Sequence, residues 1–167
     1  MNPDLLHLGV RHRLEQIGVE FEVMECDPAF ADTATFVQAY GVPLDRSANT
    51  IVVASKGAEP SYVACVALAT TSLDVNRAVR REMGVRKASF AGADAVRALT
   101  GMEIGGVTPF GLPDGMPILV DARVMDAPWI VLGGGNRSSK LKVAPDALRR
   151  LPALRVVDGL AALKRDA

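Results

Sequence analysis

The chain has 167 residues, the length of one compact domain rather than two. Hydrophobic residues make up 49% of it and charged residues 23%, so the composition excludes a disordered or low-complexity chain. Nineteen basic residues balance nineteen acidic ones; this argues against dedicated binding of long duplex DNA, but it allows a brief contact with a nucleic-acid end through a local basic patch.

No segment predicts a membrane span or a signal peptide. The longest uncharged apolar run, residues 62–69, is far shorter than the ~20 residues that cross a bilayer, and the N-terminus lacks an apolar signal core. Cys26 and Cys65 belong to no CxxC or Cys/His cluster, so we interpret them as small buried hydrophobic residues rather than a redox pair. We therefore expect a cytoplasmic protein that needs no metal, no cofactor and no membrane.

The chain begins with a helical pattern followed by a strand pattern. Apolar residues three and four apart predict an amphipathic helix over residues 4–17, with Gly18 at its C-terminal end. Alternating apolar and acidic residues then predict a half-exposed strand over residues 19–23.

A second helix and a hairpin follow. Asp32 or Thr33 can cap a helix that runs through Tyr40 and closes at Gly41. Two β-branched apolar runs, residues 49–55 and 61–69, flank the turn signal KGAEP and predict a β-hairpin.

The second half of the chain contains shorter elements. The patterns predict helices over residues 74–84 and 92–101, strands over 117–121 and 129–132, and a tail from Pro145 with one or two short helices around a strand at 155–157. Adjacent strand pairs lie too close in sequence for helical crossovers. The interleaved pattern therefore favours an α+β fold with a mixed or antiparallel sheet over a doubly wound parallel one.

Two glycine-rich segments, residues 104–113 and 132–140, are candidate ligand-binding loops. Glycines let backbone N–H groups approach a ligand closely, and preorganised donors suit a developing oxyanion. The second segment leads into a small basic patch of Arg137, Lys140 and Lys142, which could meet a phosphate or a terminal carboxylate. The alternatives are an ordinary turn-rich connection for the first segment and a solvated hairpin tip for the second.

The usual catalytic motifs are missing. His7 and His12 lie five residues apart on the first predicted helix, so they do not share the face that a metal site needs. No serine lies in GxSxG, and there is no GxxxxGK[ST] phosphate loop. Asp121 ends an apolar strand, where it either orients the amino group of a ligand or caps a turn.

From about Asp32 to Leu148 the sequence resembles the YbaK-type family of aminoacyl-tRNA editing proteins, related to the editing domain inserted in bacterial prolyl-tRNA synthetases. The segments that carry the resemblance are NTIVV (49–53), VNRAVRREMGVRKASFA (75–91), GGVTPFG (105–111), ILVD (118–121) and GGG with KLKVAPDAL (133–148). No one motif is decisive, but together they are fairly specific.

The resemblance implies a single α+β domain over residues 1–167, with a mixed, partly barrelled β-sheet flanked by short helices. It implies hydrolysis of the ester bond between a small mischarged amino acid, such as Ala, Cys or Ser, and the terminal adenosine of a tRNA. The implied partner is an aminoacyl-tRNA, for which tRNA-Pro is one candidate. A second candidate partner is prolyl-tRNA synthetase. The implied catalytic residues are Asn49, Gly105 and Gly106, and the implied substrate-binding residues are Val107, Thr108, Pro109, Phe110, Asp121, Gly133 and Gly134.

Asn49 departs from the family pattern, because family members often carry a substrate-contacting lysine at this position. A hydrogen bond from a charged donor contributes ~1.5–3 kcal/mol, against ~0.5–1.5 kcal/mol for a neutral one. Loss of the charge could therefore cost about one order of magnitude in rate. Lys56 cannot replace it without a bulge, because residue 56 points to the opposite face of the strand.

Three functions are compatible with the sequence. The first is a free-standing deacylase, and the second is a binding module that kept the pocket but lost turnover with the lysine. The third, a sequence-independent nucleic-acid binder, conflicts with the neutral charge balance. Five basic residues, at positions 77, 80, 81, 86 and 87, either dock an acceptor stem or form the solvated side of a helix.

Overall fold

The hairpin predicted around residue 58 is the centre of the fold. In the computed structural model, which describes residues 2–165, strand β2 pairs with β3 in an antiparallel register that runs from Ala48 opposite Leu68 to Ala54 opposite Tyr62. β3 then pairs with β6, and β6 with β9, both in parallel. The resulting five-stranded sheet has the order β5-β2-β3-β6-β9 and is mixed, as expected.

In the described part of the chain, ten strands form three sheets. They are β1 (Glu22–Glu25), β2 (Ala48–Ser55), β3 (Tyr62–Leu68), β4 (Thr71–Leu73), β5 (Ala88–Phe90), β6 (Ile118–Asp121), β7 (Ile130–Gly133), β8 (Ser139–Val143), β9 (Leu154–Val157) and β10 (Ala161–Leu163). Within residues 2–165, β5 and β9 do not pair with each other, so the large sheet is open and not a closed barrel.

The helices are short. The α-helices are α1 (Leu8–Ile17), α2 (Thr33–Tyr40), α3 (Arg80–Met83), α4 (Ala93–Thr100) and α5 (Ala122–Met125). Short 3₁₀ segments are η1 (Pro3–Leu5), η2 (Pro28–Phe30), η3 (Leu44–Arg46) and η5 (Pro145–Arg150), and η4 (Val75–Val79) is a π-helical turn.

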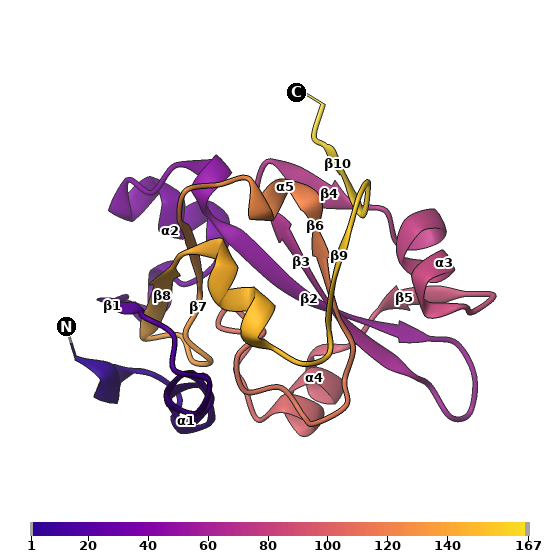
Figure 1. Ribbon diagram of the computed structural model, residues 1–167, viewed down its shortest axis with the longest axis horizontal. Coiled ribbons are helices and arrows are strands. Elements are labelled where there is room, and N and C mark those ends of the chain that lie inside the picture. Colours follow the sequence, from indigo (N-terminus) through magenta and orange to yellow (C-terminus); the bar gives the residue numbers. More distant parts are fainter. Residues whose placement is uncertain (1, 166–167) are drawn as a thin grey trace.

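A second sheet, β1-β8-β7, is antiparallel and lies beside the beginning of β2 (Figure 1). An isolated bridge between Ser47 and Val131 joins the two sheets. Beyond this bridge β2 and β7 diverge, and β2 continues toward β5. The divergence leaves room for a pocket between the sheets.

Apolar side chains fill both sides of the large sheet. One core lies between α1, β3, β6, β7 and η5, and it includes the fully buried side chains of Val10, Leu14 and Phe110. A smaller core around Val53 and Leu119 lies on the other face. With few aromatic residues, the core consists mainly of Val, Leu and Ala.

Most predicted elements are confirmed, with shifted ends. The first helix begins only at Leu8, because His7 caps it: its Nδ1 accepts a hydrogen bond from Gly9 N–H. The prediction of a strand over residues 19–23 is wrong at its start, because β1 begins only at Glu22, opposite Lys142. The partner strand β8 ends at Val143, before the turn that contains Pro145, so residues 19–21 have almost no strand to pair with.

Candidate functional site

A pocket of about 330 Å³ lies where β2 and β7 diverge. This volume is within the usual range for sites that bind small molecules. Aliphatic side chains form much of its wall, and its polar side chains are those of Asp32, Thr33, Ser47, Asn49, Thr50 and Lys140. The pocket therefore offers an apolar space with a few polar groups, which suits an amino acid more than a polyanion.

Lys140 is the central polar group of the pocket. It lies on β8 between Met24 and Gly133, and only 6% of it is exposed. Its Nζ donates hydrogen bonds to Ala31 O at 2.7 Å and to Gly105 O at 3.0 Å. Because an ammonium group has three donors, one N–H is left for a ligand.

The surroundings of Lys140 destabilise its charge. Within residues 2–165, no carboxylate lies within ion-pair distance of its Nζ. The Phe36 ring, whose centre lies 5.1 Å from Nζ, offers a cation–π contact that offsets only part of the cost of burial. Burial lowers the pKa of Lys140 and Arg137 lowers it further, while Cys26 and Asp32 oppose the shift. Such a buried, lone ammonium group is costly for stability and often marks a functional site.

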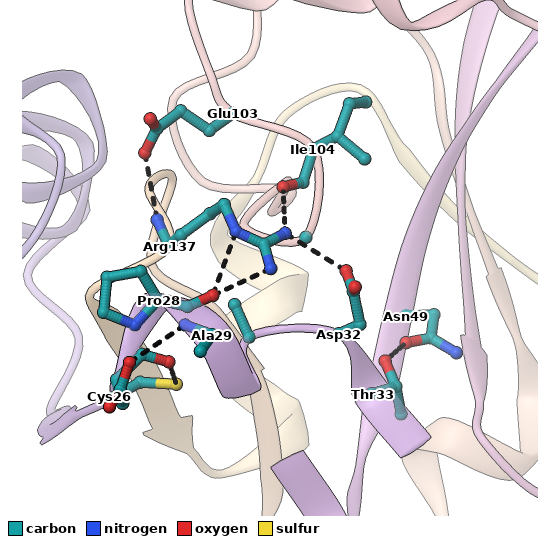
Figure 2. A network of polar contacts seen from close by, with 12 residues as sticks. Cys26, Pro28, Ala29, Asp32, Thr33, Asn49, Glu103, Ile104 and Arg137 are labelled. Carbon is teal, nitrogen blue, oxygen red and sulfur yellow. Dashed lines mark hydrogen bonds and ion pairs between the residues drawn. The ribbon is translucent and has the colours of Figure 1, made fainter. Parts of the chain in front are cut away.

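Arg137 holds the mouth of the pocket together (Figure 2). Its guanidinium donates hydrogen bonds to Pro28 O at 2.8 and 3.1 Å, to Ile104 O at 2.9 Å and to Asp32 Oδ1 at 3.1 Å. Its own backbone N–H donates to Glu103 Oε2 at 3.0 Å. One side chain thus joins the turn before α2, the first glycine-rich loop and the β7–β8 turn.

The two glycine-rich segments pack backbone against backbone. Gly135 N–H donates to Gly106 O at 2.6 Å, and Glu103 N–H donates to Gly135 O at 3.1 Å. A Cβ at Gly106 would lie 2.1 Å from Asn136 O, and one at Gly133 would lie 2.4 Å from Gly106 O. These glycines are therefore required mainly for close packing of the two loops.

One expected donor of the first glycine-rich loop, the N–H of Gly106, is not free for a ligand. Gly106 N–H donates to Glu103 O at 2.9 Å, which conflicts with its expected role as an oxyanion donor. Gly105 and Val107 line the pocket, but Gly105 O accepts the bond from Lys140. The loop thus orients the lysine that the pocket contains.

The edge of β2 also supplies free backbone groups. Val52 O accepts a hydrogen bond from Ala91 N–H at 2.9 Å, so Thr50, two residues earlier, directs its N–H and C=O to the same edge. Between the bridge at Ser47 and the pairing with β5 from Val53, this edge pairs with no strand among the described residues. A ligand in the pocket can bind there as a strand would.

Asn49 lies in the pocket, as expected. Its Oδ1 accepts a hydrogen bond from the hydroxyl of Thr33, at the start of α2 (Figure 2). Because the amide oxygen is occupied, the amide nitrogen remains as a donor. Lys56 is exposed in the hairpin turn and does not line the pocket.

Several predicted substrate-binding residues lie elsewhere. Thr108 and Phe110 are fully buried, with Phe110 in the main core, and Pro109 lines a different hollow together with Pro113. After Val107 the chain enters the core with Thr108 and Phe110, so these two residues do not line the pocket.

Asp121 and Gly134 do not line the pocket either. Asp121 is fully buried at the end of β6, where its Oδ1 accepts a hydrogen bond from Ala161 N–H at 3.4 Å and its Oδ2 lies 3.6 Å from Arg123 Nη1. Its carboxylate anchors β10 rather than a ligand. Gly134 lies against Ser139, whereas Gly133 is in the pocket wall.

The predictions from sequence missed Asp32 and did not place Lys140. Asp32 was expected only as a helix cap, yet its carboxylate bonds Arg137 and lines the pocket. Lys140 and Lys142 are two residues apart on β8 and therefore share one face of the strand, so the sequence alone cannot distinguish them. Only Lys140 is buried there.

Neither cysteine has the properties of a nucleophile. Both are free and buried, and burial raises the pKa of Cys65 to about 12 and also raises that of Cys26. Among the described residues, no three His, Cys, Asp or Glu side chains lie close enough to hold a metal ion. The described helices are also too short or too polar to span a membrane.

An open mixed sheet, a smaller antiparallel sheet and a pocket between them define a known class of small α+β protein. The fold matches a proposed trans-editing enzyme for prolyl-tRNA synthetase with a TM-score of 0.77 and 24% identity, over 96% of this chain and 99% of the other. It also matches the hypothetical protein APE2540 with a TM-score of 0.80 and 22% identity, over 92% and 99% of the two chains. These likenesses establish the fold.

The chain belongs to the aminoacyl-tRNA editing domain family, whose model matches residues 27–151. It is also 28% identical to the uncharacterized protein YwhH of Bacillus subtilis (strain 168), over 140 residues that make up 84% of this chain and 87% of the relative. The family resemblance expected from the sequence is confirmed.

Proposed function

We propose that this protein hydrolyses the ester bond of a tRNA mischarged with a small amino acid, such as Ala, Cys or Ser. The tRNA that we propose is tRNA-Pro, with prolyl-tRNA synthetase as the partner that mischarges it. The observation that carries the proposal is Lys140, a buried ammonium group in the pocket of a chain from the editing family. It supplies from β8 the positive charge that Asn49 does not supply from β2.

The polar groups of the pocket match the parts of an aminoacyl ester. The free N–H of Lys140 and the amide nitrogen of Asn49 donate to the ester carbonyl, where negative charge develops during attack. The backbone C=O of Thr50 and the carboxylate of Asp32 accept from the α-ammonium group. The apolar wall, which includes Val52 and Val96, surrounds the side chain.

The reaction is a simple ester hydrolysis. Water attacks the carbonyl carbon, the bond from that carbon to the ribose oxygen breaks, and this oxygen leaves with the proton that water gives up. The products are the free amino acid and a tRNA with a free terminal hydroxyl. We assign the proton transfer to the neighbouring ribose hydroxyl, because Arg137 holds Asp32, the one carboxylate that lines the pocket among residues 2–165.

The selection of small amino acids follows from exclusion by size. A pocket can reject side chains that are too large, but each extra methylene gains only ~1–3 kcal/mol of binding. We therefore expect graded rates among Ala, Cys and Ser and no hydrolysis of aminoacyl-tRNAs with large aromatic side chains.

A deacylation time course with purified protein tests the proposal. Hydrolysis of Ala-, Cys- or Ser-tRNA-Pro above the spontaneous rate supports it, and a lower rate for Asn49→Ala places Asn49 in the site. Lys56→Ala is the matched control, because Lys56 is exposed outside the pocket. The absence of turnover on all three substrates would overturn the proposed activity.

A non-catalytic binding module for aminoacyl-tRNA is the second candidate, favoured by Asn49 in place of the family lysine. The variant Asn49→Lys separates the two functions. If wild type is inactive and Asn49→Lys hydrolyses the substrate, the binding module is the better description. If wild type is active and the variant is not faster, Lys140 already supplies the charge.

A further inference from the structure

The segment from Asp74 to Phe90 is a basic surface on a chain with no net charge. It carries five basic residues and only two acidic ones, Asp74 and Glu82. Both acidic side chains are engaged: Asp74 Oδ1 accepts from Arg77 N–H at 3.2 Å, and Glu82 Oε2 lies 3.1 Å from Arg155 Nη2. Neither carboxylate lies within ion-pair distance of a basic side chain of this segment, so the segment keeps an excess of positive charge.

Four arginines of this segment surround one hollow of about 660 Å³, formed by η4, α3 and the turn after α3. They are Arg77, Arg80, Arg81 and Arg86, and all four are exposed. Among residues 2–165, none of them lies within ion-pair distance of a carboxylate. Arg80 Nη1 donates to Arg86 O at 2.9 Å, which fixes the turn, while the other three guanidinium groups face solvent.

β5 leads from this hollow to the pocket. Its last residue, Phe90, is 60% exposed, and the next residue, Ala91, lines the pocket. Five residue steps separate Arg86 from Ala91, so their Cα atoms lie at most ~18 Å apart. At ~3.4 Å per stacked nucleotide, this corresponds to about five nucleotides of one strand.

We propose that this surface, defined as Arg77, Arg81, Arg86 and Phe90, binds the acceptor end of the tRNA whose terminal ester lies in the pocket. The arginines contact phosphates, and Phe90 stacks with an unpaired base near the 3′ end. Exposed cations beside an exposed aromatic ring are what single-stranded RNA requires: charge for the backbone and a flat face for a base. This inference rests on the proposed function.

Binding of uncharged tRNA tests the surface without any turnover. The variant Arg81→Gln/Arg86→Gln is compared with Arg149→Gln/Arg150→Gln, which removes two exposed arginines on η5, away from this surface in Figure 1. The two variants lose the same formal charge, although Arg149 also lies 3.6 Å from Asp146 Oδ1. We expect the first variant to bind about tenfold more weakly at low salt, with a log–log salt slope shallower by ~0.7 for each lost phosphate contact. The η5 variant should bind like wild type. Equal loss in both variants, or in neither, overturns the proposal.

Phe90 is tested by Phe90→Leu, which keeps an apolar side chain but removes the ring. We expect at least about fivefold weaker binding of tRNA with its single-stranded end, because stacking contributes ~1–3 kcal/mol per base. For a tRNA without the terminal single-stranded nucleotides, wild type and Phe90→Leu should bind equally. If Phe90→Leu binds the complete tRNA as wild type does, the stacking assignment is wrong.

The failure of this proposal differs from a failure of the proposed function. If wild type binds tRNA through this surface but hydrolyses no aminoacyl-tRNA, the activity is wrong and the surface stands. If Arg81→Gln/Arg86→Gln slows the hydrolysis of both aminoacyl-tRNA and aminoacyl-adenosine, the arginines act on the pocket and not on RNA. Slower hydrolysis of aminoacyl-tRNA alone supports the assignment.

Discussion

Lys140 Nζ donates a hydrogen bond to Gly105 O at 3.0 Å and so connects β8 to the first glycine-rich loop inside the pocket. Its second acceptor, Ala31 O, belongs to the turn before α2. The ammonium group therefore joins three segments that are far apart in the sequence. It also keeps one donor for a ligand, which combines a structural and a chemical role in a single side chain.

Replacement of Lys140 by Met should slow deacylation strongly. The variant keeps the length and the apolar stem but removes the charged donor, a contribution of ~1.5–3 kcal/mol that corresponds to about a 10- to 100-fold lower kcat/KM. The matched control is Lys142→Met, two residues along the same strand. Lys142 interacts with Glu22 and Trp129 outside the pocket, so this variant should retain the wild-type rate. Equal rates for both variants would contradict the role of Lys140.

The stability contribution of Lys140 should depend on pH. Burial lowers its pKa in the folded protein below the ~10.4 of an ordinary lysine, so the unfolded chain binds more protons between the two pKa values. Stability from this residue therefore rises with pH across that window, while the full cost of the buried charge is present below the folded pKa.

Urea unfolding of wild type and Lys140→Met at about pH 7 and about pH 9.5 measures this effect. The free energy of unfolding of wild type should increase relative to the variant at the higher pH. Lys142→Met, whose lysine is partly exposed, should follow wild type at both values. If the difference in free energy of unfolding between wild type and Lys140→Met is the same at both pH values, burial does not lower the pKa of Lys140.

Gly106→Ala should destabilise the fold. The new Cβ would lie 2.1 Å from Asn136 O, and both loops are held by backbone hydrogen bonds that cannot relax easily. Overpacking of this kind costs ~1–3 kcal/mol, measured as the free energy of unfolding. At Gly92 a Cβ meets nothing within 4 Å and φ is −66°, so Gly92→Ala should change stability by less than about 1 kcal/mol. Similar losses for the two variants would refute the close packing.

The two cysteines should be unreactive in the folded protein. Burial raises the pKa of Cys65 to about 12, and its side chain has no exposed surface, so almost no accessible thiolate exists at neutral pH. We expect alkylation only after unfolding in denaturant, and full hydrolytic activity after prolonged treatment of the native protein with iodoacetamide. Rapid loss of activity would place a thiol in the reaction and contradict the proposed mechanism.

Local chemistry determined much of the fold from sequence alone. The helix ends at Gly18, Gly41 and Gly101 were predicted correctly because a left-handed residue there needs glycine, and all three have φ near +70°. The β2–β3 hairpin followed from two β-branched runs around a turn. Four strands of the described residues were not predicted. β4, β5 and β10 have three residues each, too few for a periodic pattern. β8 has five residues, but it overlaps the second glycine-rich segment, which the sequence indicated only as a loop or a hairpin tip.

The family, the pocket residue Asn49 and the importance of the glycine-rich loops were also available from the sequence. What only the tertiary structure decided is which residues face the ligand. Lys140 and Lys142 read alike in the sequence, but Phe36 lies beside the ammonium group of Lys140 and Trp129 beside that of Lys142. The carboxylate of Asp121 anchors β10, and the N–H of Gly106 donates its hydrogen bond to Glu103 O. Burial and hydrogen-bond partners depend on segments that are distant along the chain, and no local pattern encodes them.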